Sequence, residues 1–202
     1  MEELLFDITR DDDIYTEIVK KHMHDRRIII NGEISDSIFE EVCLMILKWN
    51  QEDKNLPVES RKKIYVYINT VGGEANLGMN ILNVIKTSIT PVVTVGFSKC
   101  YSMGCYILAA GHERYAFPYT TVLYHDGQSA CAASGNKARD IQKFHDAVDK
   151  RLDEFLVQNT NMDADFLEEI KDREYYMFAD EAKERGFIDK IIGVDCTMDE
   201  VL

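Results

Sequence analysis

The chain has no long hydrophobic run and no basic residues at its start. Its longest apolar stretches, such as residues 105–110 and 121–124, are far shorter than the roughly 20 residues that span a bilayer. The opening Met-Glu-Glu lacks the positive charges that begin a secretory signal peptide. These absences predict a cytoplasmic protein with no membrane segment.

Paired cysteines are also missing. The five cysteines are odd in number and show no CxxC spacing, which argues against both a disulfide framework and a zinc site. We therefore expect reduced cysteines and no metal centre. Cys43 and Cys105 lie in apolar patterns, where a free cysteine behaves as a small core residue.

Basic residues are scarce relative to acidic ones. The 36 acidic against 23 basic residues give a net charge of −13, which would repel nucleic acid or an anionic membrane surface. We expect neither as a partner. With 202 residues, of which 46% are hydrophobic, the chain fits one globular domain better than two.

Short apolar runs alternate with helical patterns from residue 27 onward. Strands are predicted at 28–30, 64–68, 92–95 and 121–124, and helices begin near 35, follow residues 72–73, and cover 103–110 and about 136–158. The apolar residues of the first predicted helix, expected to face the core, are Ile38, Val42, Leu44, Met45 and Leu47. This alternation predicts an α/β fold of βα units around a mainly parallel sheet.

The predicted helices and strands fall within one domain at residues 26–195. The polar residues 1–25, with a weak amphipathic stretch at 14–19, are expected to form a partly ordered N-terminal arm. Residues 196–202 are expected to form a C-terminal tail. The charged helix at 136–158 is expected to be exposed over much of its surface.

Ser102 lies at a predicted junction between a strand and a helix. There a hydroxyl can be exposed while backbone N–H groups point at an incoming oxygen, an arrangement that suits acyl transfer. A serine at a helix start is more often only an N-cap. Gly72 and Gly73 follow another strand, and an N–H group there could stabilise an oxyanion, although the pair could equally be a plain helix-entry turn.

His125 ends a predicted strand and could reach the same sheet edge as Ser102, because ligands of parallel sheets usually bind at one edge. Its neutral imidazole could deprotonate a serine, but a histidine at a strand end is more often structural. An acid to orient it is available at Asp172 or Glu174, and spacing alone does not choose between them. The other histidines, His22, His24, His112 and His145, are expected at the surface.

Taken together and in this order, the motifs resemble the ClpP family. The matching stretches are residues 27–33 (RIIINGE), 64–73 (IYVYINTVGG), 102–105 (SMGC), 108–111 (LAAG), 122–125 (VLYH) and 179–189 (ADEAKERGFID). The resemblance implies a ClpP/crotonase-like α/β fold with a protruding long helix. It also implies a serine endopeptidase without a cofactor, the degradative subunit of an ATP-dependent Clp protease.

The resemblance further implies that identical subunits form a homo-oligomer of two stacked heptamers, a tetradecamer that encloses a proteolytic chamber. Unfolded polypeptides would be delivered to it by an AAA+ unfoldase of the ClpX, ClpA or ClpC type. Tyr65 and Tyr67 match the aromatic surface on which such unfoldases dock.

Carried over by position, Ser102 is the nucleophile and His125 its base. The N–H groups of Gly73 and Met103 would hold the oxyanion. The family's aspartate falls at Glu174, with Asp172 in reserve. The chain departs from the family at Thr70-Val71, where Ser-Pro is usual, and at Asp126-Gly127, where a proline is usual.

Three other functions fit parts of this pattern. An inactive, ring-forming ClpP-like subunit is made plausible by the altered acid but disfavoured by the presence of both Ser102 and His125. A crotonase-type acyl-CoA enzyme would also use backbone N–H groups for an oxyanion, but no basic patch suits a CoA phosphate. A signal-peptide-peptidase relative with a Ser/Lys dyad is disfavoured by the absence of a membrane anchor.

Overall fold

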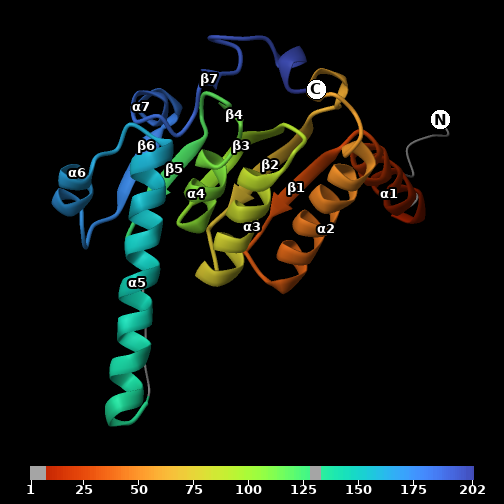
Figure 1. Cartoon of the computed structure of the whole chain (residues 1–202). Helices are drawn as coiled ribbons and strands as arrows, with labels where there is room; N and C mark the ends of the chain where they lie inside the picture. The colour runs from red at the N-terminus through yellow and green to blue at the C-terminus, as the bar shows by residue number, and fades with distance from the viewer. Residues whose placement is uncertain (1–7, 128–132) are drawn as a thin grey trace.

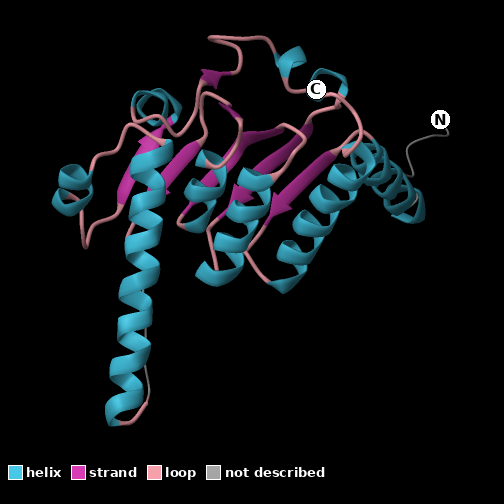
Figure 2. Cartoon of the chain, in the orientation of Figure 1, coloured by secondary structure: helices cyan, strands magenta, loops and turns pink. Residues whose placement is uncertain are grey.

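A twisted, mostly parallel sheet forms the centre of the molecule, and one long helix projects away from it (Figure 1). The computed structural model describes residues 8–127 and 133–202, so Cys131 lies outside the described residues. Figure 2 shows helices on one face of the sheet. The predicted α/β class and the mainly parallel sheet are confirmed.

The sheet has seven strands in the order β1-β2-β3-β4-β7, with β5 paired to the far end of β3 and β6 paired to β5. Every pairing is parallel except that of β5 with β6. The strands are β1 Arg27–Asn31, β2 Ile64–Thr70, β3 Val92–Tyr101, β4 Glu113–Ala116, β5 Thr121–Tyr124, β6 Tyr175–Phe178 and β7 Lys190–Ile191.

The helices connect these strands. They are α1 Ile8–His24, α2 Asp36–Asp53, α3 Ala75–Thr87, α4 Met103–Ala109, α5 Gly135–Asn159, α6 Ala164–Glu169 and α7 Ala179–Glu184, with short 3-10 turns η1 at Val58–Ser60 and η2 at Met198–Glu200. Helix α5 buries only Val148, Leu152 and Leu156, all in its second half. Its first half therefore protrudes, as Figure 1 shows. None of the helices in the described ranges is long and apolar enough to cross a membrane.

Strand β2 shows how the sequence separates the two faces of the sheet. Ile64, Val66 and Ile68 are fully buried in the core under the helices. The intervening Tyr65 and Tyr67 point to the opposite face, where they pack in a second, smaller cluster. This alternation follows from the two-residue period of a strand.

Two sequence-based expectations differ from the structure. The sequence pattern predicts Leu44 and Leu47 in the buried stripe of α2, yet these two side chains are 56% and 55% exposed. The buried residues are Val42, Cys43, Ile46 and Trp49, whose spacing places them on one side of the helix. At the N-terminus, α1 extends over Ile8–His24, well beyond the weak amphipathic stretch at 14–19.

A buried ion pair joins the start of β1 to the end of α2. Arg26 donates to both carboxylate oxygens of Asp53, at 2.5 and 2.9 Å, and the Thr90 hydroxyl donates to Asp53 Oδ2 at 2.7 Å. The Asp53 side chain is only 2% exposed. The Arg26 hydrogen bonds, opposed by burial and helped by Thr90, hold the pKa of this carboxyl below its usual 3.8.

We predict that Asp53→Ala lowers the free energy of unfolding by about 3–5 kcal/mol, because it leaves the mostly buried Arg26 with only the exposed Glu52 carboxylate as a charged partner. Urea unfolding at pH 7 measures this. Glu52→Ala is the matched control, because Glu52 also pairs with Arg26, at 3.3 Å, but is 47% exposed; its loss should cost less than about 1 kcal/mol. Similar losses in the two variants would contradict the prediction.

The same pair predicts a pH dependence. Since the folded-state pKa of Asp53 is depressed, its stabilisation is complete above the unfolded-state value of 3.8 and is lost as the pH falls through the lower folded-state pKa. The difference in unfolding free energy between wild type and Asp53→Ala should therefore shrink below pH 3.8.

Candidate active site

Ser102 occupies a sharp turn between β3 and α4. Its backbone has φ 51° and ψ −124°, a conformation that residues other than glycine rarely adopt. The turn is fixed on both sides: the Ser102 amide donates to the Leu123 carbonyl at 2.9 Å, and the Cys105 amide donates to the Ser102 carbonyl at 2.9 Å. A serine on a strained strand-to-helix turn is the arrangement that exposes a nucleophilic hydroxyl.

Helix α4, which follows this serine, is buried and closely packed. Every residue of α4 is buried. A Cβ on Gly104 would come within 2.5 Å of Thr70 Cγ2 in β2, and one on Gly78 of α3 would come within 2.5 Å of Met103 Cε. These close approaches fix the position of Ser102 relative to β2 and α3.

Gly72 lies directly beside the serine, and Gly73 lines the same cavity as the serine. A Cβ on Gly72 would be 2.6 Å from Ser102 Cβ, and one on Gly73 would be 2.4 Å from the Ile34 carbonyl oxygen. Both have positive φ, of 101° and 150°. Among the described residues, neither the Gly73 amide nor the Met103 amide donates a hydrogen bond, so both N–H groups are available to an oxyanion.

His125 and Glu174 are brought together by the register of two antiparallel strands. Tyr124 of β5 is paired with Tyr175 of β6, so the residue after one strand faces the residue before the other. His125 Nδ1 lies 2.9 Å from Glu174 Oε1. The imidazole is 21% exposed and the carboxylate 51%.

Asp172, the other candidate acid, forms no hydrogen bond or ion pair with His125 among the described residues. It has a positive φ of 60° and is exposed, and its backbone amide donates to Asp126 Oδ2 at 2.8 Å. Of the two acids in this segment, Glu174 is therefore the one beside the imidazole.

Ser102, His125, Gly73 and Met103 line one cavity of about 920 Å³. Its volume is at the upper end of the range of small-molecule pockets, which leaves room for a segment of peptide. Within residues 8–127 and 133–202, no hydrogen bond joins the Ser102 hydroxyl to the His125 imidazole. The serine and the histidine thus share a cavity but are not yet aligned for proton transfer.

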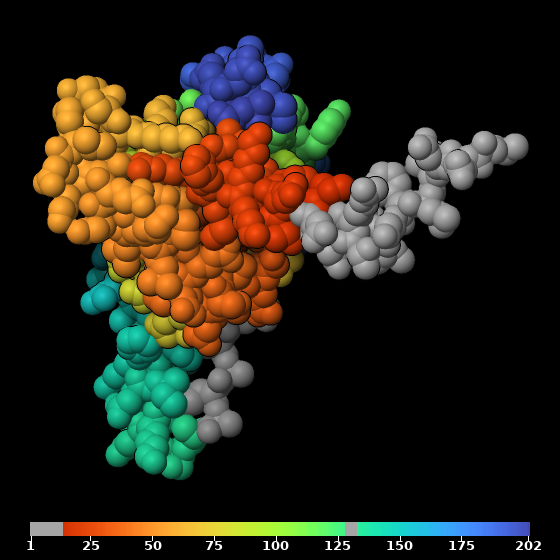
Figure 3. Space-filling view, turned by 90° about the vertical axis from the view of Figure 1, so that its right-hand side faces the viewer, coloured from red at the N-terminus to blue at the C-terminus, as the bar shows by residue number. Residues whose placement is uncertain are grey.

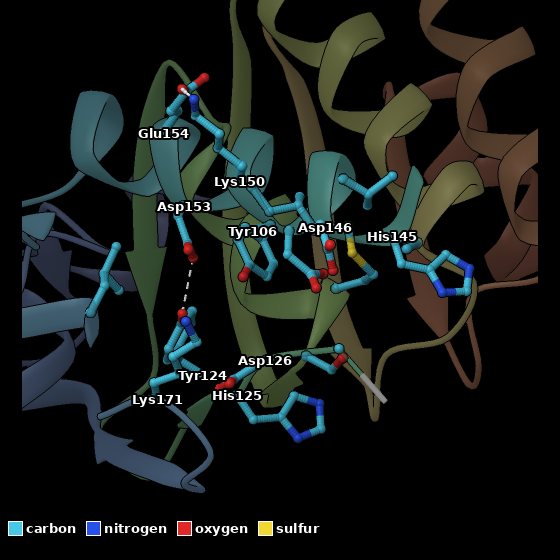
Figure 4. A pocket seen from close by; sticks show the side chains of 18 of the residues that line it. Tyr106, Tyr124, His125, Asp126, His145, Asp146, Lys150, Asp153, Glu154 and Lys171 are labelled. Carbon is cyan, nitrogen blue, oxygen red and sulfur yellow. Dashed lines mark hydrogen bonds and ion pairs between the residues drawn. The ribbon is translucent and has the colours of Figure 1, made fainter. Parts of the chain in front are cut away.

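The opposite wall of this cavity is acidic, which the sequence reasoning missed. Figure 4 shows Asp146, Asp153 and Glu154 of α5 on one side and His125 and Asp126 on the other. The Tyr124 hydroxyl donates to Asp153 Oδ1 at 3.0 Å. The signal that could have found this wall is the helical spacing of Asp146, Asp149 and Asp153, which places them on one face of α5.

Burial raises the pKa of the Asp149 carboxyl, and the neighbouring carboxylates of Asp126 and Asp146 raise it further. For Asp153, too, burial is the largest cause of a raised pKa, opposed by the Tyr124 hydrogen bond. No described residue forms a salt bridge with either carboxylate. The lining of the cavity therefore carries more acidic than basic side chains, with Lys150 and Lys171 as its two lysines.

We predict that Asp149→Asn stabilises the protein at pH 7. A carboxyl whose folded-state pKa is raised destabilises the fold progressively as the pH rises from the unfolded-state pKa of 3.8 through the folded-state value. Asparagine removes that penalty, so the gain in unfolding free energy should be larger at pH 7 than at pH 4. Asp140→Asn, at an exposed position of the same helix, is the control; an equal gain there would contradict the prediction.

Tyr65 and Tyr67 do not belong to this cavity. They lie on the helix-free face of the sheet, in a cluster with Val93, Val95 and Tyr115. A surface for a partner at these tyrosines would therefore be separate from the cavity at Ser102.

The comparison with known families agrees with the motifs in the sequence. The family model described as Clp protease matches residues 10–195. That range includes the whole sheet, the turn at Ser102 and the pair of His125 with Glu174. The chain belongs to the Clp protease family.

Proposed function

We propose that this chain is a serine endopeptidase with Ser102 as nucleophile, His125 as general base and Glu174 as the acid that orients the imidazole. The observation that carries the proposal is the 2.9 Å contact between His125 Nδ1 and Glu174 Oε1, because His125 lines the same cavity as the strained Ser102 turn. Membership of the Clp protease family supports a peptidase.

In the proposed reaction, the Ser102 hydroxyl attacks a peptide carbonyl and transfers its proton to His125 Nε2. Glu174 accepts the Nδ1–H hydrogen bond, which fixes the tautomer and stabilises the imidazolium. The tetrahedral oxyanion accepts hydrogen bonds from the Gly73 and Met103 amides. The C–N bond breaks as His125 returns the proton to the leaving amine, and water, deprotonated by His125, then hydrolyses the acyl-enzyme.

Glutamate can replace the aspartate usual in the family, because the pairing of β5 with β6 positions the Glu174 carboxylate 2.9 Å from His125 Nδ1. The longer side chain is half exposed and reaches the ring from the residue just before β6. The separation of the Ser102 hydroxyl from His125 is expected to close when substrate enters, since catalytic hydrogen bonds often tighten only in the bound state.

We further propose that the subunits assemble as two stacked heptamers in the cytoplasm and receive unfolded polypeptides from an AAA+ unfoldase that docks at Tyr65 and Tyr67. Exposed apolar side chains on two helices support self-association: Ile14, Tyr15 and Ile18 on α1, and Leu44 and Leu47 on α2. The protruding half of α5 offers a further contact surface between rings.

Two measurements on the purified protein test this proposal together. Light scattering gives the mass of the assembly, and cleavage of a fluorogenic peptide, short enough to enter the chamber without an unfoldase, gives endopeptidase activity. Peptide cleavage by an assembly of about fourteen subunits is the expected result. An assembled ring without cleavage would favour the inactive subunit, and turnover of acyl-CoA thioesters instead would favour the crotonase-type enzyme.

A further inference from the structure

One face of the sheet is covered by a short segment instead of a helix. We call residues 197–202 the strap, and Tyr65, Tyr67, Val93, Val95 and Tyr115 the tyrosine face. The strap follows β7 and includes the 3-10 turn Met198–Glu200. Figure 3 shows these last residues, in blue, at the top of the molecule.

The strap is attached to the tyrosine face mainly through Val201. This side chain is 1% exposed and packs within the cluster of the tyrosine face. The Tyr67 hydroxyl donates to the Val201 carbonyl, and the Tyr65 hydroxyl approaches the Glu200 carbonyl at 3.5 Å. Both tyrosines thus bind the backbone of the strap.

The other contacts of the strap are exposed. Glu200 Oε2 accepts from Lys190 Nζ at 2.7 Å and lies 3.5 Å from the Tyr115 hydroxyl, but the two charged side chains are 40% and 44% exposed. Exposed pairs of this kind contribute little. Met198 and Leu202, at 49% and 56% exposed, leave about half of their surface in solvent. One aliphatic side chain and a few hydrogen bonds therefore hold the strap, as expected of a segment that opens locally.

We propose that the strap is a built-in competitor for the tyrosine face: a partner loop can dock there only after Val201 leaves. The bound strap also indicates what such a loop needs, namely a branched aliphatic side chain in the place of Val201 and a backbone carbonyl for the Tyr67 hydroxyl. The identity of the partner as an unfoldase rests on the proposed function; the competition itself does not.

The aromatic side chains beside the tyrosine face support displacement of the strap by a partner loop. The Phe97 ring meets Tyr67 edge-on at 6.4 Å and Phe117 at 5.6 Å between ring centroids. Phe97 remains 56% exposed with the strap in place. A partner loop could therefore cover apolar surface that the strap leaves open, and this extra contact would drive displacement. The apparent affinity of the loop would be its intrinsic affinity multiplied by the fraction of subunits in which the strap has left the face.

The test uses a fluorescein-labelled peptide with the sequence of the strap, Thr-Met-Asp-Glu-Val-Leu, and measures its binding by fluorescence anisotropy. A chain ending at Cys196 should bind the peptide at least tenfold more tightly than the wild type, because its tyrosine face is empty. A peptide with aspartate in place of the valine should not bind.

Point variants repeat the test without truncation. Val201→Asp should expose the face and bind the labelled peptide as the truncated chain does. Leu202→Asp, which changes the exposed neighbour, should behave as the wild type. Equal binding of the peptide to wild type and Val201→Asp, or no binding to a truncated chain with the wild-type circular dichroism spectrum, would overturn the proposal.

Peptide binding also separates this proposal from the proposed peptidase. Ser102→Ala should leave the binding of the labelled peptide unchanged, because Ser102 lies in a different site. Failure to cleave the fluorogenic peptide would therefore contradict the proposed function alone, and failure of the strap peptide to distinguish the variants would contradict the competition alone.

Discussion

Replacing Ser102 with alanine should lower kcat for peptide hydrolysis by about 10³-fold or more, while the protein keeps its oligomer size. The reaction as proposed needs a hydroxyl at this position, and no other hydroxyl is held on the strained turn before α4. The buried α4 and its contacts with Gly78 and Thr70 do not involve the Ser102 oxygen, so the fold should remain. Cleavage of a fluorogenic peptide at saturating concentration measures the loss.

Ser98→Ala is the matched control for this variant. Ser98 lies in the same strand and is exposed, and its hydroxyl is not part of the cavity at Ser102. We expect activity within about twofold of wild type for Ser98→Ala. If Ser102→Ala retained comparable activity, another residue would have to be the nucleophile.

The second large effect is expected at Glu174. Glutamine at this position keeps the size of the side chain but removes the charge that stabilises the imidazolium, and its amide can turn an N–H toward Nδ1. We expect Glu174→Gln to lower kcat by about 10²–10⁴-fold, with KM little changed. Glu174→Asp should retain more activity than glutamine, because it restores the carboxylate at the cost of a shorter reach.

Asp172→Asn distinguishes the two candidate acids. The structure places the Asp172 amide on Asp126 and brings only Glu174 to His125. Asp172→Asn should therefore retain nearly full activity. A loss at Asp172 as large as that at Glu174 would contradict the assignment of the orienting acid.

Local patterns in the sequence predict a strand well where the whole strand consists of a single apolar run. The prediction of 121–124 matches β5, and the long helix at 136–158 differs from α5 by one residue at each end. Strand β3 was predicted to end at Val95 but extends to Tyr101. Its second half contains exposed Phe97, Ser98 and Lys99 and is stabilised by pairing with β5, which no local pattern reveals.

The choice of acid illustrates what spacing cannot give. Asp172 and Glu174 are two residues apart, and either could precede an aromatic strand in the sequence. What places Glu174 at His125 is the antiparallel register of β5 with β6, in which Tyr124 faces Tyr175. That register depends on tertiary packing. The acidic wall of Asp149 and Asp153 was missed for a similar reason, because a charged helix is ordinarily solvated and only the fold directs this face into the cavity.

The central claim is that Ser102 is an activated nucleophile, and the mass of the intact protein after treatment with a fluorophosphonate tests it most directly. Such a reagent phosphonylates a serine that is deprotonated by its base beside an oxyanion site. We predict one adduct per subunit on the wild type and none on Ser102→Ala. An assembled wild-type ring without adduct, or an adduct that persists in Ser102→Ala, would contradict it.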